Sequence, residues 1–422
     1  MNRRNFIKSA STLGLLAGAG IHAPAIAQQK PLKVGVLAGR SGALGAIGEC
    51  GLRATEWAVD RINKQGGIAG RKVELAVEEE TSPKDTSDRF KKLVLQSGVD
   101  CVQGVLSTGV MLSIGVVAEE SKTVFLSWDG TTQSGVEETM PNAKYTFKST
   151  DNEVEAMIAG IMAINRYKGQ FKTMAGMNND FSYGRNAWSA FQALLKKYKI
   201  DSQSVSEQWI KVGAIDLTSS VNAVKSAQPD LLYISVLFGE APVLMKQAAA
   251  AGLFKQSKIV YPMGGFNQNQ LKKEFTPEGF ILGLNTLSFD YEGASSLQKE
   301  FVSYYMERFK EPPSSAAERA YFAMELYRRG VEKAVNALGG RWPTKEEVAA
   351  NIEDLEVESL GGKARMKKNH IPEQLFYLGT TTHDNNYDFV TIKDVKVVSS
   401  EGFQKPQGGD FWKWIEDAQF SV

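Results

Sequence analysis

The sequence predicts an α/β protein of two lobes, each built on a mostly parallel sheet that helices cover on both faces. Short apolar runs alternate with longer segments in which apolar residues recur at helical spacing, and this alternation is typical of parallel sheets. Residues 28–422 are also too many for one ordinary hydrophobic core, which favours two lobes over one.

The first elements follow directly from the local sequence. Residues 33–38 are apolar and predict a strand, and the glycines within residues 39–48 predict a turn after it. Apolar residues at helical spacing then predict a helix over 49–64, which Gly66 and Gly67 end.

The same signals assign most of the remaining chain. Further strands are predicted over residues 72–77, 101–106, 123–127, 173–177, 205–212, 231–236, 258–262 and 279–285. Further helices are predicted over residues 85–97, 110–122, 184–198, 216–227, 241–251, 295–309, 316–338 and 345–351. The end of the chain predicts strands and loops over 374–379 and 388–398, followed by an aromatic tail, Phe411-Trp412-Lys413-Trp414.

Residues 1–27 have the features of an export signal. Arg3 and Arg4 precede a short apolar run, and small residues end the segment at Ala27. The paired arginines indicate a twin-arginine signal peptide, although Asn2 stands where Ser or Thr is more usual and leaves the general secretory route open. We therefore expect a soluble protein that works in the periplasm.

Composition narrows the classes of function. Lys and Arg total 49 and Asp and Glu total 48, so the chain has no charge excess for binding nucleic acid or an anionic membrane. Beyond the signal no stretch approaches the ~18 apolar residues that span a bilayer, and we expect no direct membrane insertion. No cluster of His, Cys and acidic residues has metal-ligand spacing, so we expect neither a metal site nor a cofactor.

The two cysteines are predicted to be free and buried. Cys50 falls at the start of a helix beside the carboxyl end of the first strand, whereas Cys101 begins a later strand at the opposite edge of the sheet. This separation exceeds the ~7 Å between Cα atoms that a disulfide can bridge.

The topology itself nominates a binding site. Parallel sheets bind ligands at the carboxyl ends of their strands, where the loops to the following helices meet. The loops at these ends are rich in glycine, hydroxyl and aromatic residues, and they comprise residues 39–48, 106–109, 127–132, 178–184, 237–240 and 263–267.

Several short segments then follow one another in a distinctive order. They are 58–63 (Ala-Val-Asp-Arg-Ile-Asn), 66–75 (Gly-Gly-Ile-Ala-Gly-Arg-Lys-Val-Glu-Leu), Asp216-Leu217-Thr218-Ser219, Gln228-Pro229-Asp230, Glu311-Pro312-Pro313 and Ala320-Tyr321. In these segments the chain resembles the branched-chain amino acid (Leu/Ile/Val-type) periplasmic binding proteins of ABC transporters. The resemblance extends from about residue 33 to residue 380.

The resemblance implies the type I solute-binding fold, with three hinge crossovers near residues 148–151, 285–287 and 361–365. One lobe would then comprise residues 31–149 plus 287–364, and the other residues 150–286 plus 365–422. A monomer would close on a small-molecule ligand and present the closed form to ABC permease subunits, without bond chemistry. A periplasmic sensor that hands its closed state to a membrane receptor is the alternative.

The resemblance also implies ligand-binding residues. Thr108 matches a hydroxyl that binds the ligand carboxylate, and Gly109 lies at the helix start whose backbone N–H groups add donors. The alternative for Thr108 is a role in capping that helix. Thr131 matches a second hydroxyl anchor, and Tyr183 matches a tyrosine that covers the ligand from the other lobe.

Four further positions bear on the ligand. Trp128 and Phe238 lie in predicted cleft loops. Gly264 stands where amino-acid binders have the glutamate that holds the ligand ammonium, and Asp129 stands where a small neutral residue is usual. Asp129 either faces a cationic or amide N–H group of the ligand or points out and caps the next turn. The ligand is therefore expected to be an amide, an aromatic or other organic acid, or an unusual amine, unless Asp129 replaces the glutamate for an amino acid.

A nucleotide-cofactor enzyme is a remote alternative, since Gly39, Gly42, Gly45 and Gly48 join a strand to a helix. Their spacing is not G-x-G-x-x-G, and the sequence has no nucleophile elbow and no P-loop. We therefore expect a protein that is not an enzyme.

Overall fold

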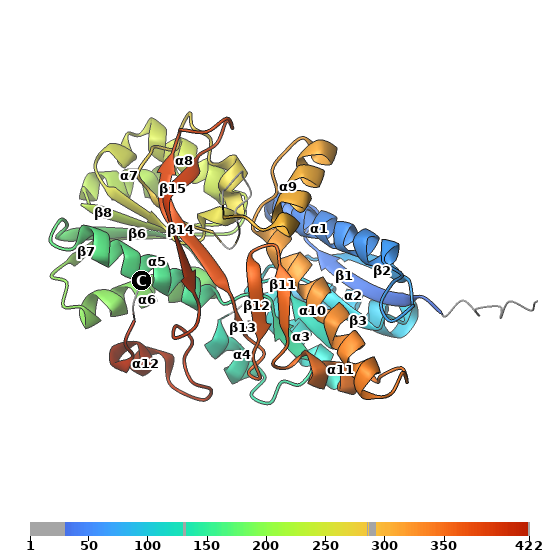
Figure 1. Cartoon of the computed structure of the whole chain (residues 1–422). Helices are drawn as coiled ribbons and strands as arrows, with labels where there is room; N and C mark the ends of the chain where they lie inside the picture. Colours follow the sequence, from blue (N-terminus) through green and yellow to red (C-terminus); the bar gives the residue numbers. More distant parts are fainter. Residues whose placement is uncertain (1–29, 130–131, 285, 287–292, 421–422) are drawn as a thin grey trace, which may run out of the picture.

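The computed structural model describes residues 30–129, 132–284, 286 and 293–420, and the predicted signal peptide lies outside this range. The protein has two bodies side by side, each with its own sheet (Figure 1). The predicted fold class, mostly parallel sheets flanked by helices, is confirmed.

The first body is built on a parallel sheet with the strand order β2-β1-β3-β4-β5. Its strands are β1 (Leu32–Ala38), β2 (Val73–Glu79), β3 (Cys101–Gly104), β4 (Val124–Ser127) and β5 (Thr146–Lys148). The helices between them are α1 (Gly45–Lys64), α2 (Pro83–Lys92), α3 (Thr108–Glu120) and α4 (Gln133–Thr139). Phe90 of α2 packs edge-to-face on Phe125 of β4 and closes one face of the sheet.

The second body has a larger, mixed sheet with the order β15-β14-β10-β9-β8-β6-β7. Strands β10, β9, β8, β6 and β7 of this order are parallel to one another. Strand β14 runs antiparallel to β10, and β15 runs antiparallel to β14. Its strands are β6 (Thr173–Asn179), β7 (Gln203–Ile210), β8 (Leu231–Ser235), β9 (Lys258–Tyr261), β10 (Ile281–Leu284), β14 (Leu375–Thr382) and β15 (Thr391–Ser399). Its helices are α5 (Asn152–Tyr167), α6 (Ser182–Lys197), α7 (Thr218–Ala227), α8 (Glu240–Ala250) and α12 (Phe411–Asp417).

Between β10 and β14 the chain returns to the first body. The helices α9 (Ser296–Phe309), α10 (Ala316–Ala337) and α11 (Lys345–Ile352) lie there, beside a small antiparallel sheet of β11 (Glu356–Ser359), β12 (Gly362–Met366) and β13 (Pro372–Glu373). Trp57 of α1 packs against Phe301 of α9 and Tyr321 of α10. The lobe boundaries and crossovers given above stay predictions, and residues 285 and 287 lie outside the described chain.

Within the described residues, three helices did not follow from sequence periodicity. The largest is α5, whose residues are apolar and buried on almost every side, so it lacks the polar stripe that reveals an amphipathic helix. Asp151 starts it by accepting hydrogen bonds from the backbone N–H groups of Glu153 and Val154. The short helix α4 was also unassigned, and the predicted aromatic tail is helix α12, capped by Asp410.

Both thiols are free and buried, as predicted. Cys50 lies in α1 and Cys101 in β3. Over the described residues, no helix has the length and apolar character needed to cross a bilayer.

The turn after β1 depends on close backbone approach at Gly48. A Cβ atom at this position would lie 2.0 Å from the carbonyl oxygen of Gly39, whereas one at Gly45 would lie no nearer than 3.4 Å to the backbone of Arg40. Helix α1 can therefore start against the end of β1 only because residue 48 has no side chain.

We predict that Gly48→Ala lowers the free energy of unfolding by about 2 kcal/mol or more, because the new methyl group forces backbone to move. Gly45→Ala is the matched control and should be neutral or stabilising by about 0.5 kcal/mol. Urea unfolding of both variants measures this, and equal losses would contradict the close approach.

Candidate functional site

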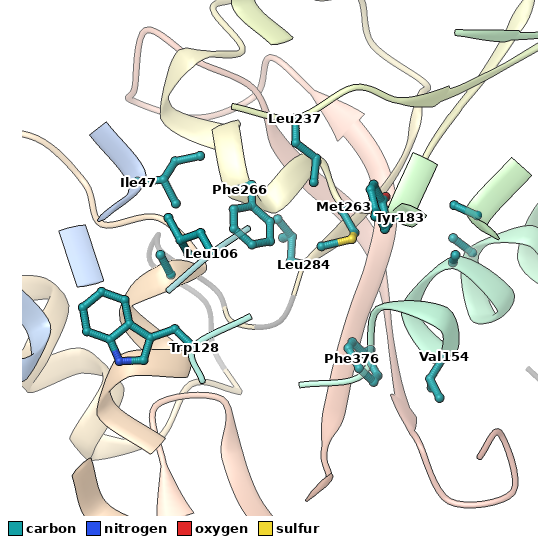
Figure 2. Close-up of a cluster of buried hydrophobic side chains, with 14 of the residues drawn as sticks. Ile47, Leu106, Trp128, Val154, Tyr183, Leu237, Met263, Phe266, Leu284 and Phe376 are labelled. Atoms are coloured by element: carbon teal, nitrogen blue, oxygen red, sulfur yellow. The ribbon is translucent and has the colours of Figure 1, made fainter. Parts of the chain in front are cut away.

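The loops at the carboxyl ends of the two sheets face each other across a closed cleft. Figure 2 shows Ile47 and Leu106 of the first body directed towards Phe266 of the second. The bodies also touch elsewhere, since a Cβ at Gly239 would lie 3.4 Å from the Cα of Ala43. The side chains in this cleft are therefore buried between the two bodies.

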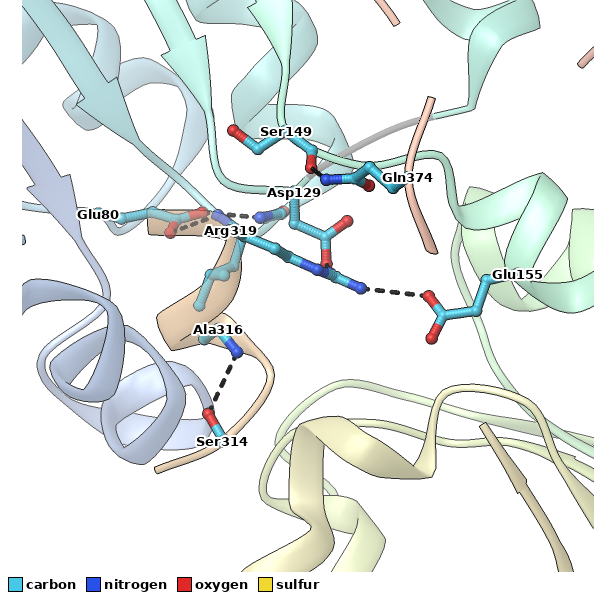
Figure 3. A network of polar contacts seen from close by, with 10 residues as sticks. Glu80, Asp129, Ser149, Glu155, Ser314, Ala316, Arg319 and Gln374 are labelled. Atoms are coloured by element: carbon cyan, nitrogen blue, oxygen red, sulfur yellow. Dashed lines mark hydrogen bonds and ion pairs between the residues drawn. The ribbon is translucent and has the colours of Figure 1, made fainter. Parts of the chain in front are cut away.

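A fully buried arginine links the bodies at the centre of this cleft (Figure 3). Arg319, from α10, forms an ion pair with Asp129, which follows β4 in the same body. Its other terminal nitrogen lies 3.2 Å from a carboxyl oxygen of Glu155, on α5 of the second body. The guanidinium also stacks over the ring of Phe266, 4.2 Å from its centroid. We call Asp129, Arg319 and Glu155 the bridging triad.

The triad gives Asp129 a partner that sequence reasoning did not identify. Its side chain is buried. It meets a cation that the protein supplies, so its charge is compensated by Arg319 before any ligand enters.

Burial raises the pKa of Glu155 to about 8. Arg319 opposes this shift, whereas the neighbouring carboxylates of Asp129 and Asp151 add to it. Glu155 therefore holds its proton to a higher pH than an exposed glutamate does, and one of its carboxyl oxygens faces the guanidinium.

Another buried carboxyl group fixes the loop that leads to Thr108. Glu80 follows β2 and accepts hydrogen bonds from the backbone N–H groups of Leu106 and Ser107, both 2.8 Å long. Burial raises the pKa of Glu80 to about 7, against the lowering effect of these two bonds. The same loop contains Val105 at a φ of 63°, an unusual backbone conformation for a β-branched residue. The two hydrogen bonds to Glu80 therefore hold the loop before Thr108 in this conformation.

The residues predicted to bind the ligand carboxylate differ in burial and in their place in the fold. Thr108 is buried and is the first residue of α3, while Ser107 takes the N-cap position, so capping does not account for Thr108. Gly109 is exposed, with the side chain of Pro83 beside it. Thr131 lies outside the described residues.

Trp128 points away from the cleft into the first body. Its indole N–H donates to the side-chain oxygen of Gln103, and its ring lies where a Cβ at Gly51 would come within 2.6 Å. Packing between the sheet and α1 accounts for this residue.

Tyr183 and Phe238 form part of an aromatic wall on the second body. Phe238 stacks on Phe181, with ring centroids 6.1 Å apart, and meets Phe266 edge-on. The hydroxyl group of Tyr183 is buried and has no hydrogen-bond partner among the described residues. Burial raises the pKa of Tyr183 well above its usual value, so the hydroxyl remains a proton donor. A buried donor without an acceptor is costly to the folded protein.

Gly264 offers no group to the cleft. It begins a short 3-10 helix after β9, and a Cβ there would lie 2.0 Å from a methyl carbon of Leu282 on β10. A glutamate at this position would therefore start towards the interior of the second body.

Sequence reasoning missed Arg319, Glu155 and Glu80. Arg319 directly precedes the Ala320-Tyr321 pair, and it is a charged residue within a stretch of α10 that is buried on all sides. A charge in such an apolar stretch is the signal that would have identified it. Glu155 was missed because α5 was not assigned.

Comparisons with known proteins agree with this architecture. The family model described as periplasmic binding protein matches residues 31–386. The Leu/Ile/Val-binding protein homolog 3 of Brucella melitensis is 24% identical over 78% of this chain and 85% of that protein.

Solved structures are similar in fold at lower identity. A solute-binding protein of an ABC transporter from Rhodopseudomonas palustris, in complex with 3,4-dihydroxybenzoic acid, has a TM-score of 0.74 and 21% identity, over 86% of this chain and 96% of that one. A branched-chain amino acid transporter substrate-binding protein from Streptococcus pneumoniae, in complex with isoleucine, has a TM-score of 0.71 and 20% identity, over 88% and 100%.

We predict that Arg319→Met lowers the free energy of unfolding by about 3–5 kcal/mol, because it leaves Asp129 buried without a cation. Arg328→Met is the control on the same helix. Arg328 pairs with Glu325 and Glu332 at the partly exposed surface, so its loss should cost about 1 kcal/mol or less. Denaturant unfolding compares the two, and similar losses would argue against a central role for the triad.

The raised pKa of Glu155 predicts a dependence of stability on pH. Between the ordinary value of 4.5 and about 8, the folded protein keeps a proton that the unfolded chain releases. The unfolded state then binds fewer protons, so the free energy of unfolding falls as pH rises through this window.

Glu155→Gln should flatten this fall, since the amide cannot titrate but can still accept from Arg319. Glu347→Gln is the control, because the pKa of Glu347 is about 2 and lies below the window. Urea unfolding at pH 5, 6, 7 and 8 gives the slopes. An unchanged slope in Glu155→Gln would show that another group dominates.

Proposed function

The chain belongs to the periplasmic binding protein family, and from this premise we propose that it captures a small organic ligand between its two bodies for an ABC transporter. The observation that carries the proposal is the inter-body cleft, in which polar groups at the carboxyl ends of both sheets are buried against each other. Ligand binding would shift an equilibrium between open and closed forms, with residues 31–149 plus 287–364 moving against 150–286 plus 365–422.

Two side chains are suited to hold the ligand. Thr108 begins α3, where the helix dipole and free backbone N–H groups favour an anionic or carbonyl oxygen. Tyr183 approaches from the second body with an unpartnered hydroxyl group. A ligand that accepts from both would connect the two bodies and favour closure.

The ligand class we propose is an aromatic or other small organic acid, or its amide. Gly264 supplies no carboxylate for an ammonium group, and Asp129 is already paired with Arg319. The wall formed by Phe181, Phe238 and Phe266 suits an apolar or aromatic body. Relatives of this fold are known with 3,4-dihydroxybenzoic acid, benzoate and isoleucine, and the first two fit these features better.

The remaining parts of the proposal follow the family. The protein would be exported to the periplasm and would present its closed form to permease subunits. It would bind and release the ligand unchanged, as expected for a protein that is not an enzyme.

A thermal-shift screen tests the ligand class directly, because a ligand stabilises the folded protein by RT ln(1 + [L]/Kd). We would compare benzoate, 4-hydroxybenzoate, 3,4-dihydroxybenzoate, their amides, leucine and isoleucine. Shifts with the aromatic acids or amides and none with the amino acids are expected. A shift with isoleucine alone would overturn the ligand class and leave the binding function.

We predict that Thr108→Val weakens binding of the best carboxylate or amide from this screen by about 1–3 kcal/mol, because the ligand oxygen loses its hydroxyl donor. Thr108→Ser keeps a hydroxyl at the same place and should bind nearly as well as the wild type. Titration calorimetry of both variants measures the difference, and equal affinities for all three proteins would remove Thr108 from the site.

A further inference from the structure

A cavity lies between α4 of the first body and α6 and α12 of the second. Its volume is about 540 Å³, within the range of small-ligand pockets. Residues of both bodies line it, among them Thr132, Ser134, Glu138, Glu153, Phe181 and Trp412. We call it the α4–α6 pocket.

The charge balance of this pocket is acidic. Its one lining cation among the described residues is Arg185, which forms an ion pair with Asp180 at 2.5 Å and stacks on Trp209. The carboxyl groups of Glu138 and Glu153 form no ion pair with any described residue. A ligand therefore meets two carboxyl groups and a cation that is already engaged.

Glu153 is the buried acid of the pocket. One carboxyl oxygen accepts from the side-chain amide of Asn186 on α6, at 3.4 Å. Burial and the nearby Asp151 raise the pKa of Glu153 to about 8, while Lys148 and the hydroxyl of Thr132 act in the opposite direction. A cation in the pocket would favour the ionised form, which burial otherwise disfavours.

Hydroxyl and aromatic groups complete the lining. The hydroxyl oxygen of Ser134 is buried without a hydrogen-bond partner among the described residues. Trp412 comes from the aromatic tail of the sequence, which forms helix α12 with Asp410 as its N-cap. The residue remains 40% exposed. An indole ring beside carboxyl groups is a combination that binds organic cations.

We propose that the α4–α6 pocket is a second small-molecule site, selective for a primary amine on an apolar or aromatic body. Glu138 and Glu153 neutralise the ammonium group, Ser134 and Thr132 accept its hydrogen bonds, and Phe181 and Trp412 contact the apolar body. Neither Thr108 nor Tyr183 lines this pocket, whereas Phe181 belongs both to its lining and to the aromatic wall of the cleft.

Titration calorimetry with 2-phenylethylamine tests this site, with 2-phenylethanol as the neutral analogue and 3-phenylpropionate as the anionic one. The wild type should bind the amine at least tenfold more tightly than either analogue. Trp412→Ala and Glu138→Gln, both at the exposed rim, should each weaken amine binding at least fivefold. Trp414→Phe changes an aromatic residue of the same helix outside the pocket lining and should leave the affinity unchanged.

The outcomes separate this site from the cleft. If Thr108→Val and Tyr183→Phe weaken amine binding while Trp412→Ala does not, the amine occupies the cleft and the proposal is wrong. Absence of amine binding to the wild type also overturns it, whatever the cleft binds. The proposal is supported if only Trp412→Ala and Glu138→Gln weaken amine binding and neither variant changes the response to benzoate.

Discussion

A guanidinium group removed from water needs counter-charges, and this need organises the centre of the protein. Arg319 is fully buried, so its charge is tolerable only where carboxyl groups and a ring face surround it. Asp129 supplies the first carboxylate, Glu155 adds a second contact from the other body, and Phe266 covers the guanidinium plane. Three segments distant in sequence must therefore meet at one point, which fixes α10, the end of β4 and the start of α5 relative to one another.

Around this point the polar groups of the cleft are of two kinds. Some are fully used by the protein, as Glu80 is in holding the loop before α3. Others are left incomplete, and the hydroxyl of Tyr183 is the clearest example. The first kind positions the loops independently of a ligand. Under the proposed function, the second kind would supply hydrogen bonds to the ligand.

The sequence predicted the fold because the alternation of strands and helices is local information. The prediction failed where the signal was not local or not periodic. Helix α5 is apolar on almost every side, so nothing in its own sequence distinguishes it from buried strands. The pairing of Arg319 with Asp129 joins positions 190 residues apart, and no pattern within either segment reveals it.

The predicted site residues show the same limit, because a local sequence signal does not give the direction of a side chain. Trp128 follows a strand in which alternate side chains face opposite sides, and its parity directs it to α1 and away from the cleft. The resemblance implies a functional residue at the position of Gly264, yet a side chain there would face Leu282. Position along the chain selects the loops at the carboxyl ends of the strands, whereas the direction of each side chain depends on packing between distant elements.

The bridging triad also bears on the opening movement proposed above. Asp129 and Arg319 belong to the same body, so opening would separate only Glu155 from Arg319. Exposed to water, Glu155 would lose the burial that raises its pKa and would hold its proton less strongly. Closing would then take up a proton from the medium, so a lower pH would favour the closed form.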